Sequence, residues 1–94
     1  MNITISELQT YIKNKDHQPD LKNAYFQKLI EEIGELSEAL RKDKKMDKQG
    51  TIKGTIDEEL YDCLYYLIAL ANVYDVDLQQ SFNLKEQLNK EKYK

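Results

Sequence analysis

Two short groups of acidic residues are the part of this sequence that could do chemistry. The first lies within residues 31–35, which read EEIGE, and the second within residues 57–62, which read DEELYD. Each group sets two carboxylates three residues apart, so on a helix they lie one above the other on the same face. Two such faces that meet would surround a hard divalent cation such as Mg²⁺ with oxygens, and Mg²⁺ usually arrives with a phosphate substrate.

The rotational position of these acids in their helices singles out four of them. At about 100° per residue, the apolar arc of the first segment contains Glu32 and has Glu35 at its edge, whereas Glu31 falls outside. The apolar arc of the second segment contains Glu59 and has Asp62 at its edge. A carboxylate turned toward an apolar core is costly unless it is paired or binds a metal. The phase therefore favours a metal site over two ordinary solvated faces.

The same arcs predict which apolar residues form the core. The first arc contains Tyr25, Leu29, Ile33, Leu36, Ala39 and Leu40, and the second contains Leu60, Cys63, Leu64, Leu67, Leu70 and Ala71. Several aromatic residues lie off these arcs, including Phe26, Tyr61 and Tyr65. Aromatic residues beside a core stripe indicate a second buried face. The first and last helices of the same chain could cover these residues. Because a chain this short has a small core, we instead expect a subunit interface there, in a homodimer or homotetramer.

Capping signals and breakers place four helices in one domain that spans residues 1–94. Capping boxes begin at Thr4 and Thr55, and Asp77 with Gln80 caps the last segment. The predicted helices are a short first one after Thr4 and three over about residues 20–42, 56–74 and 77–92, with a Lys-rich loop at residues 41–54. Short connections favour an all-α, four-helix bundle-like fold, completed by oligomerisation.

Composition excludes several classes of protein. The net charge of −3, with acids and bases interspersed, argues against a nucleic-acid-binding surface. A single cysteine gives no disulfide framework within the chain. We see no signal peptide, and the longest apolar run, residues 63–71, is too short to span a membrane. We therefore expect a cytoplasmic protein that binds neither membranes nor nucleic acids.

The two acidic motifs resemble those of the MazG-like all-α nucleoside triphosphate pyrophosphohydrolases, which carry EExxE on one helix and ExxD on the next. The resemblance covers roughly residues 20–93 and implies a MazG-type fold. It also implies Mg²⁺-dependent, or Mn²⁺-dependent, cleavage of a (deoxy)nucleoside triphosphate to the monophosphate and pyrophosphate. The implied metal ligands are Glu32, Glu35, Glu59 and Asp62. Either Glu35 or Glu31 could take the proton from the attacking water, and the sequence leaves this choice open.

The resemblance extends to residues that would bind the substrate. The family often ends with a Lys, an Asn four residues later, then a basic residue and a Tyr, which here are Lys85, Asn89, Lys92 and Tyr93. The first three share one helical stripe, which suits a polyphosphate. Tyr66, one turn after Asp62, is implied to lie near the phosphates. For the base, His17, Lys22 and Phe26 are candidates.

Other functions remain open at this stage. A helical interaction module without activity would explain the tyrosines, although not the acids within two apolar arcs. A dUTPase-like enzyme and a phosphoribosyl-ATP pyrophosphohydrolase are alternatives within the same superfamily. A di-iron carboxylate bundle needs Glu-x-x-His pairs, and the one histidine, His17, lies in a predicted loop.

Overall fold

The computed structural model describes residues 1–48 and 50–92, and this part of the chain is helical without strands. Its α-helices are α1 (Ile5–Lys15), α2 (Lys22–Arg41), α3 (Ile56–Val73) and α4 (Leu78–Lys92), with a 3₁₀ turn at Pro19–Leu21. The predicted all-α class with four helices is confirmed. In the described residues, no helix is both long enough and apolar enough to cross a membrane.

Side-chain caps start α1 and α3 where the sequence predicts, whereas α2 begins at Lys22 without one. The Thr4 hydroxyl accepts a hydrogen bond from the Glu7 amide (3.1 Å), and the Glu7 carboxylate accepts one from the Thr4 amide (2.9 Å). At α3, the Thr55 hydroxyl accepts from the Glu58 amide, but the Glu58 carboxylate accepts from the amide of Gly54 instead of Thr55. In this second capping box, the bond back from the Glu58 side chain therefore reaches the residue before the N-cap.

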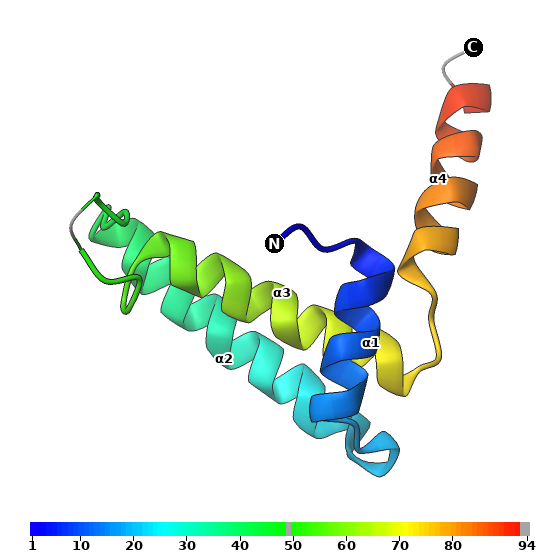
Figure 1. The fold of residues 1–94 in the computed structure, drawn as a ribbon, viewed down its shortest axis with the longest axis horizontal. Coiled ribbons are helices and arrows are strands. Elements are labelled where there is room, and N and C mark those ends of the chain that lie inside the picture. Colours follow the sequence, from blue (N-terminus) through cyan, green and yellow to red (C-terminus); the bar gives the residue numbers. More distant parts are fainter. Residues whose placement is uncertain (49, 93–94) are drawn as a thin grey trace.

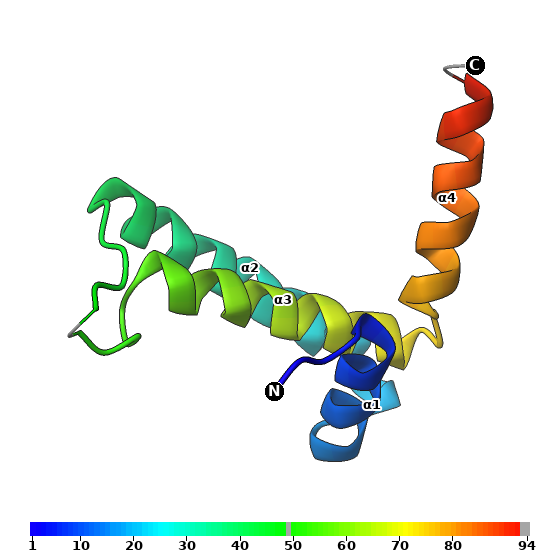
Figure 2. The ribbon, with the colours of Figure 1, turned by 45° about the horizontal axis from the view of Figure 1, so that its top comes forward.

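The α2 and α3 helices form an antiparallel hairpin, and α1 packs across the C-terminal half of α3 (Figures 1 and 2). The core lies where α1 meets the hairpin and consists of Ile12, Tyr25, Ile68, Ala69 and Val73. A polar network tightens this junction, since the Asn72 amide donates to the Gln9 carbonyl at 2.9 Å. The junction fixes α1 at the end of the hairpin where α2 begins and α3 finishes.

The α4 helix leaves the hairpin at a steep angle and extends away from it (Figures 1 and 2). None of its described residues is buried, and Phe82, Leu84 and Leu88 are between 58% and 61% exposed. Its start is tied to α1, because the Gln9 side-chain oxygen accepts a hydrogen bond from the Leu78 amide at 2.9 Å. Within one chain, the four-helix bundle therefore stays open.

The predicted apolar arcs are only partly buried. Tyr25, Leu29 and Ala39 are buried as expected. The prediction is wrong for five arc residues, which are between 38% and 54% exposed: Ile33, Leu40, Leu60, Leu64 and Leu67. The hairpin has apolar residues on two faces, and α1 covers the face with Ile68, Ala69 and Val73 instead. Helical phase identifies an apolar face but not the element that covers it.

Candidate active site

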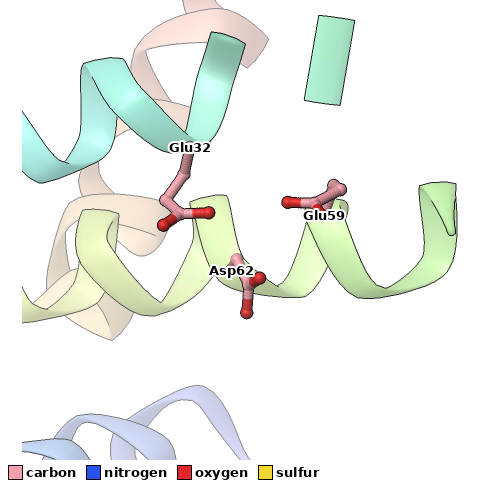
Figure 3. Close-up of side chains that lie close together, drawn as sticks. All are labelled: Glu32, Glu59 and Asp62. Atoms are coloured by element: carbon pink, nitrogen blue, oxygen red, sulfur yellow. The ribbon is translucent and has the colours of Figure 1, made fainter. Parts of the chain in front are cut away.

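Three of the four predicted metal ligands meet at the seam of the hairpin. Glu32 projects from α2 toward α3, where Glu59 and Asp62 lie one turn apart (Figure 3). Each of the three offers a carboxylate oxygen, and these oxygens lie within 4.8 Å of one another. The antiparallel pairing of α2 and α3 thus brings the two acidic motifs together, as the sequence predicts.

Glu59 is the most unusual member of this carboxylate group. Glu59 is 9% exposed, and its Oε2 atom is buried without a hydrogen-bond partner among the described residues. A buried carboxylate oxygen without a partner is costly. Oxygen donors of this kind are what Mg²⁺ and Ca²⁺ prefer, so the three carboxylates fit a hard divalent cation.

The raised pKa values of the three carboxyl groups also favour a bound cation. Burial raises the pKa of the Glu59 carboxyl above its ordinary value, and the negative charge of Asp62 raises it further. Burial and then the charge of Asp62 also raise the pKa of Glu32. Burial, followed by the charge of Glu58, raises the pKa of Asp62. Mutual repulsion therefore destabilises the ionised group, and a bound cation would relieve it.

The fourth predicted ligand, Glu35, lies in the wall of the same open cavity. This cavity has a volume of about 580 Å³ and is lined by the three carboxylates together with Lys28, Glu31, Gly34 and Glu35. Glu35 is exposed. Glu31 is also exposed, and its carboxylate pairs with the Lys28 ammonium at 3.2 Å. Among the described residues, the Glu31 carboxylate is thus engaged by a lysine, whereas Glu35 has no ion pair.

A second cavity, of about 320 Å³, adjoins the first and shares Glu32 and Asp62 with it. We call it the tyrosine cleft, and its other lining residues are Tyr11, Lys15, Tyr61, Tyr65 and Tyr66. Tyr66 thus lines the same cavity as Glu32 and Asp62. The sequence reasoning missed Tyr11 and Lys15, because their approach to α3 depends on how α1 packs.

The other predicted substrate contacts lie away from these two cavities. Lys85, Asn89 and Lys92 belong to α4, and the Asn89 amide donates to the Glu86 carboxylate at 3.2 Å. Tyr93 lies outside the described residues. The base candidates His17, Lys22 and Phe26 line neither cavity. Within the described part of a single chain, the six described residues of this set therefore do not lie at the carboxylates.

Comparison with known proteins identifies the family. The model of the MazG nucleotide pyrophosphohydrolase domain matches residues 21–94, which include both acidic motifs. The chain belongs to the MazG nucleotide pyrophosphohydrolase family. No curated protein matches the sequence. Family membership makes this chain a nucleoside triphosphate pyrophosphohydrolase.

Solved structures agree with this assignment. The chain is similar, at 52% sequence identity, to iMazG from Vibrio DAT 722 in two crystal structures, one with a C-terminal tag and one with an N-terminal tag. The TM-scores are 0.86 and 0.88, with 94% and 97% of this chain covered. The match also covers 99% and 98% of the iMazG chains. The MazG-type fold expected from the sequence is confirmed.

Proposed function

We propose that the chain hydrolyses a (deoxy)nucleoside triphosphate to the monophosphate and pyrophosphate with Mg²⁺, or Mn²⁺ in its place. The observation that carries this proposal is the buried Oε2 of Glu59, which has no hydrogen-bond partner in the described part of the chain and lies beside Glu32 and Asp62. An apolar packing role would not leave such an atom unpaired. A divalent cation that also binds phosphate would satisfy it.

The residues have distinct proposed roles. Glu32, Glu59 and Asp62 would hold the metal, and Glu35 would reach it or take the proton from the attacking water. When bound, Mg²⁺ neutralises phosphate charge and lowers the pKa of a water molecule. Glu35 suits the role of base better than Glu31, because the Glu31 carboxylate is held by Lys28. Tyr66 would lie beside the phosphates.

The basic stripe of α4 would contribute from another copy of the chain. Lys85, Asn89 and Lys92 lie on α4, which extends away from the α2–α3 hairpin of its own chain (Figure 1). A partner subunit could place this helix against the cavity. We therefore retain these residues, with Tyr93, as proposed phosphate contacts that act across an interface.

An uncovered apolar face supports the assembly of several copies. We define this hairpin face as Phe26, Ile30, Ile33, Leu40, Leu60, Leu64 and Leu67, which are between 38% and 54% exposed. These residues lie on sides of α2 and α3 that the other helices leave open. A monomer rarely exposes so many large apolar side chains together. A homodimer or homotetramer would cover them.

The test is a product assay on a panel of canonical and modified nucleoside triphosphates with Mg²⁺, followed by ³¹P NMR. We expect pyrophosphate and the monophosphate as primary products, and no turnover when EDTA replaces Mg²⁺. Orthophosphate as the primary product would contradict the proposal. A panel without any turnover under Mg²⁺ or Mn²⁺ would favour the interaction-module alternative.

A further inference from the structure

Four residues of the tyrosine cleft have no metal or phosphate role in the proposed function, namely Tyr11, Lys15, Tyr61 and Tyr65. The cleft lies between α1 and α3 and shares Glu32 and Asp62 with the carboxylate cavity, so the two open cavities are neighbours on the surface. A ligand whose phosphates lie at the carboxylates can therefore extend into the cleft without leaving the surface. The cleft volume of about 320 Å³ falls at the lower end of small-molecule sites, which span about 300–1,000 Å³.

The cleft walls present aromatic ring surface. The rings of Tyr61 and Tyr65 meet edge to face with centroids 6.4 Å apart, and those of Tyr65 and Tyr66 do so at 5.0 Å. Tyr61 is 44% exposed and Tyr11, across the cleft on α1, is 54% exposed. Exposed aromatic side chains on opposite walls of a cleft suit a flat π system, which stacks on aromatic side chains regardless of base identity.

The walls are held in place before any ligand arrives. Asp16 accepts a hydrogen bond from the Tyr25 hydroxyl at 2.7 Å and contacts the Tyr65 hydroxyl at 3.5 Å. The Tyr25 hydroxyl in turn accepts from the Gln18 amide at 2.9 Å. These contacts join the end of α1 to α2 and α3. A preformed cleft loses less conformational entropy on binding than a flexible surface does.

Lys15 supplies the polar group of the cleft. Its Nζ lies 5.9 Å from the Tyr11 ring centroid and 5.8 Å from that of Tyr65, so the ammonium stands between the two walls. It has no ion-pair partner among the described carboxylates. A lysine ammonium has three donors and no acceptor. Lys15 could therefore donate to a carbonyl oxygen or a ring nitrogen on the edge of a flat ligand in this cleft.

We infer that the tyrosine cleft is the nucleobase subsite of the proposed enzyme, where Tyr61 stacks on the base and Lys15 donates to a carbonyl oxygen of the base. The inference rests on the proposed function and adds a substrate class to it. Uracil, thymine, cytosine and guanine carry a ring carbonyl, whereas adenine does not. The chain should therefore prefer nucleotides with a carbonyl-bearing base to adenine nucleotides.

The experiment is isothermal titration calorimetry of the full chain with Mg²⁺ and three ligands that separate base from phosphate. These are the non-hydrolysable α,β-imido analogues of dUTP and dATP, and tripolyphosphate as a ligand without a base. The variants are Tyr61→Leu and Lys15→Met. The matched controls are Tyr74→Leu, an exposed tyrosine at the end of α3, and Lys13→Met, which shares the last turn of α1 with Lys15.

The expected pattern differs for each variant. Loss of one stacking partner should weaken both nucleotide analogues about tenfold in Tyr61→Leu. Lys15→Met should weaken the dUTP analogue several-fold more than the dATP analogue, which removes most of the preference for uracil. Both variants should bind tripolyphosphate within about twofold of the parent chain, and both controls should leave all three ligands unchanged.

Three results would overturn the inference. Equal losses for tripolyphosphate and nucleotides in Lys15→Met would make Lys15 a phosphate contact. Unchanged nucleotide binding in Tyr61→Leu would leave the cleft without a ligand role, and so would a parent chain that binds no nucleotide analogue. A different result would contradict the proposed reaction and leave the base subsite intact. In that case the chain would show the expected binding pattern but release no pyrophosphate from triphosphates.

Discussion

The α2–α3 hairpin and α4 both carry residues that the sequence predicts to be functional. The hairpin brings its residues together, whereas α4 holds its residues apart from them. In the hairpin, carboxylates from positions 32, 59 and 62 converge within 4.8 Å. In α4, Lys85, Asn89 and Lys92 share a helix that extends away from the hairpin (Figure 2). Two long antiparallel helices joined by one loop have few ways to pair, so their facing residues follow from helical phase. The position of α4 depends on contacts outside this hairpin.

The physical anchors of the two regions explain the contrast. The hairpin has buried residues near both ends of α2, from Tyr25 and Leu29 to Ala39. The α4 helix is anchored at its first residue, where Leu78 bonds to Gln9, and then runs without a buried residue. A helix without a buried face gains little stability from its own chain. We therefore predict that the hairpin of one chain forms the metal site by itself. The phosphate contacts of α4 should need a second subunit.

The largest effect that we expect is from Glu59→Gln. This change should abolish Mg²⁺-dependent turnover, because metal binding needs the charge. In metal-free buffer it should leave the melting temperature equal or higher, since it removes a buried, unpaired charge. Steady-state kinetics and thermal denaturation by circular dichroism measure the two effects. Glu38→Gln on α2, which loses exposed ion pairs with Arg41 and Lys42, is the control and should keep normal turnover.

A comparable result should come from Glu32→Gln, because the two carboxylates face each other across the seam (Figure 3). Near-native activity in either variant would contradict the assignment of the metal ligands. Loss of the helical signal would instead assign the carboxylates to the fold.

The second prediction concerns the hairpin face. Leu64→Glu places a charge in the middle of this exposed apolar surface and should dissociate the oligomer. Light scattering at micromolar concentration should then approach the single-chain mass of 11.1 kDa. Met46→Glu is the control, because Met46 is also 45% exposed but lies in the loop before α3. A parent chain that already scatters as a single chain would rule out the assembly.

The third prediction concerns metal and pH. Glu32, Glu59 and Asp62 have raised pKa values in the folded chain, so the folded state holds their protons more tightly than the unfolded state does. The free energy of unfolding of the metal-free chain should therefore rise as the pH falls from 7 through these raised values toward the ordinary glutamate pKa of 4.5. Denaturant titrations across this range measure the trend.

Addition of Mg²⁺ should reverse this pattern. The ion should stabilise the chain most at neutral pH, where all three carboxylates are ionised, and progressively less as they become protonated. Stabilisation by Mg²⁺ that does not depend on pH, or that persists in Glu59→Gln, would place the ion elsewhere on the chain.

The smallest expected effect is from Lys85→Ala, which should raise the KM for triphosphates a few-fold with an unchanged melting temperature. Lys85 lies on an exposed stripe, so its loss should cost binding and not folding. Lys90→Ala, on the same helix, is the control. An unchanged KM would remove Lys85 from the proposed phosphate contacts.

A mixing experiment sharpens this prediction. If α4 acts across subunits, an excess of the inactive Glu59→Gln chain should restore a normal KM to the Lys85→Ala chain. The mixed oligomer then contains a site with intact carboxylates from one chain and intact Lys85 from the other. A mixture that keeps the raised KM would place Lys85 in its own chain's site.

Local sequence signals predict the helix starts and the carboxylate group well. The Thr4 capping box and the pairing of Glu32 with Glu59 and Asp62 depend on residues close in sequence or on one antiparallel pair of helices. The tyrosine cleft could not be predicted in this way, because Lys15 reaches Tyr65 only through the angle at which α1 crosses α3. The exposure of Leu60, Leu64 and Leu67 was missed for a related reason. Apolar phase does not say whether a helix of the same chain or another subunit covers a face.

The most direct test of the central claim is hydrolysis of a nucleoside triphosphate in ¹⁸O-labelled water, with the products analysed by mass spectrometry. If the carboxylates of the hairpin hold the α phosphate for attack by water, one ¹⁸O atom should enter the monophosphate and the pyrophosphate should stay unlabelled. Glu59→Gln should give neither product. Label in the pyrophosphate would mean attack at the β phosphate, and label in orthophosphate would mean attack at the γ phosphate, and either result would contradict the account.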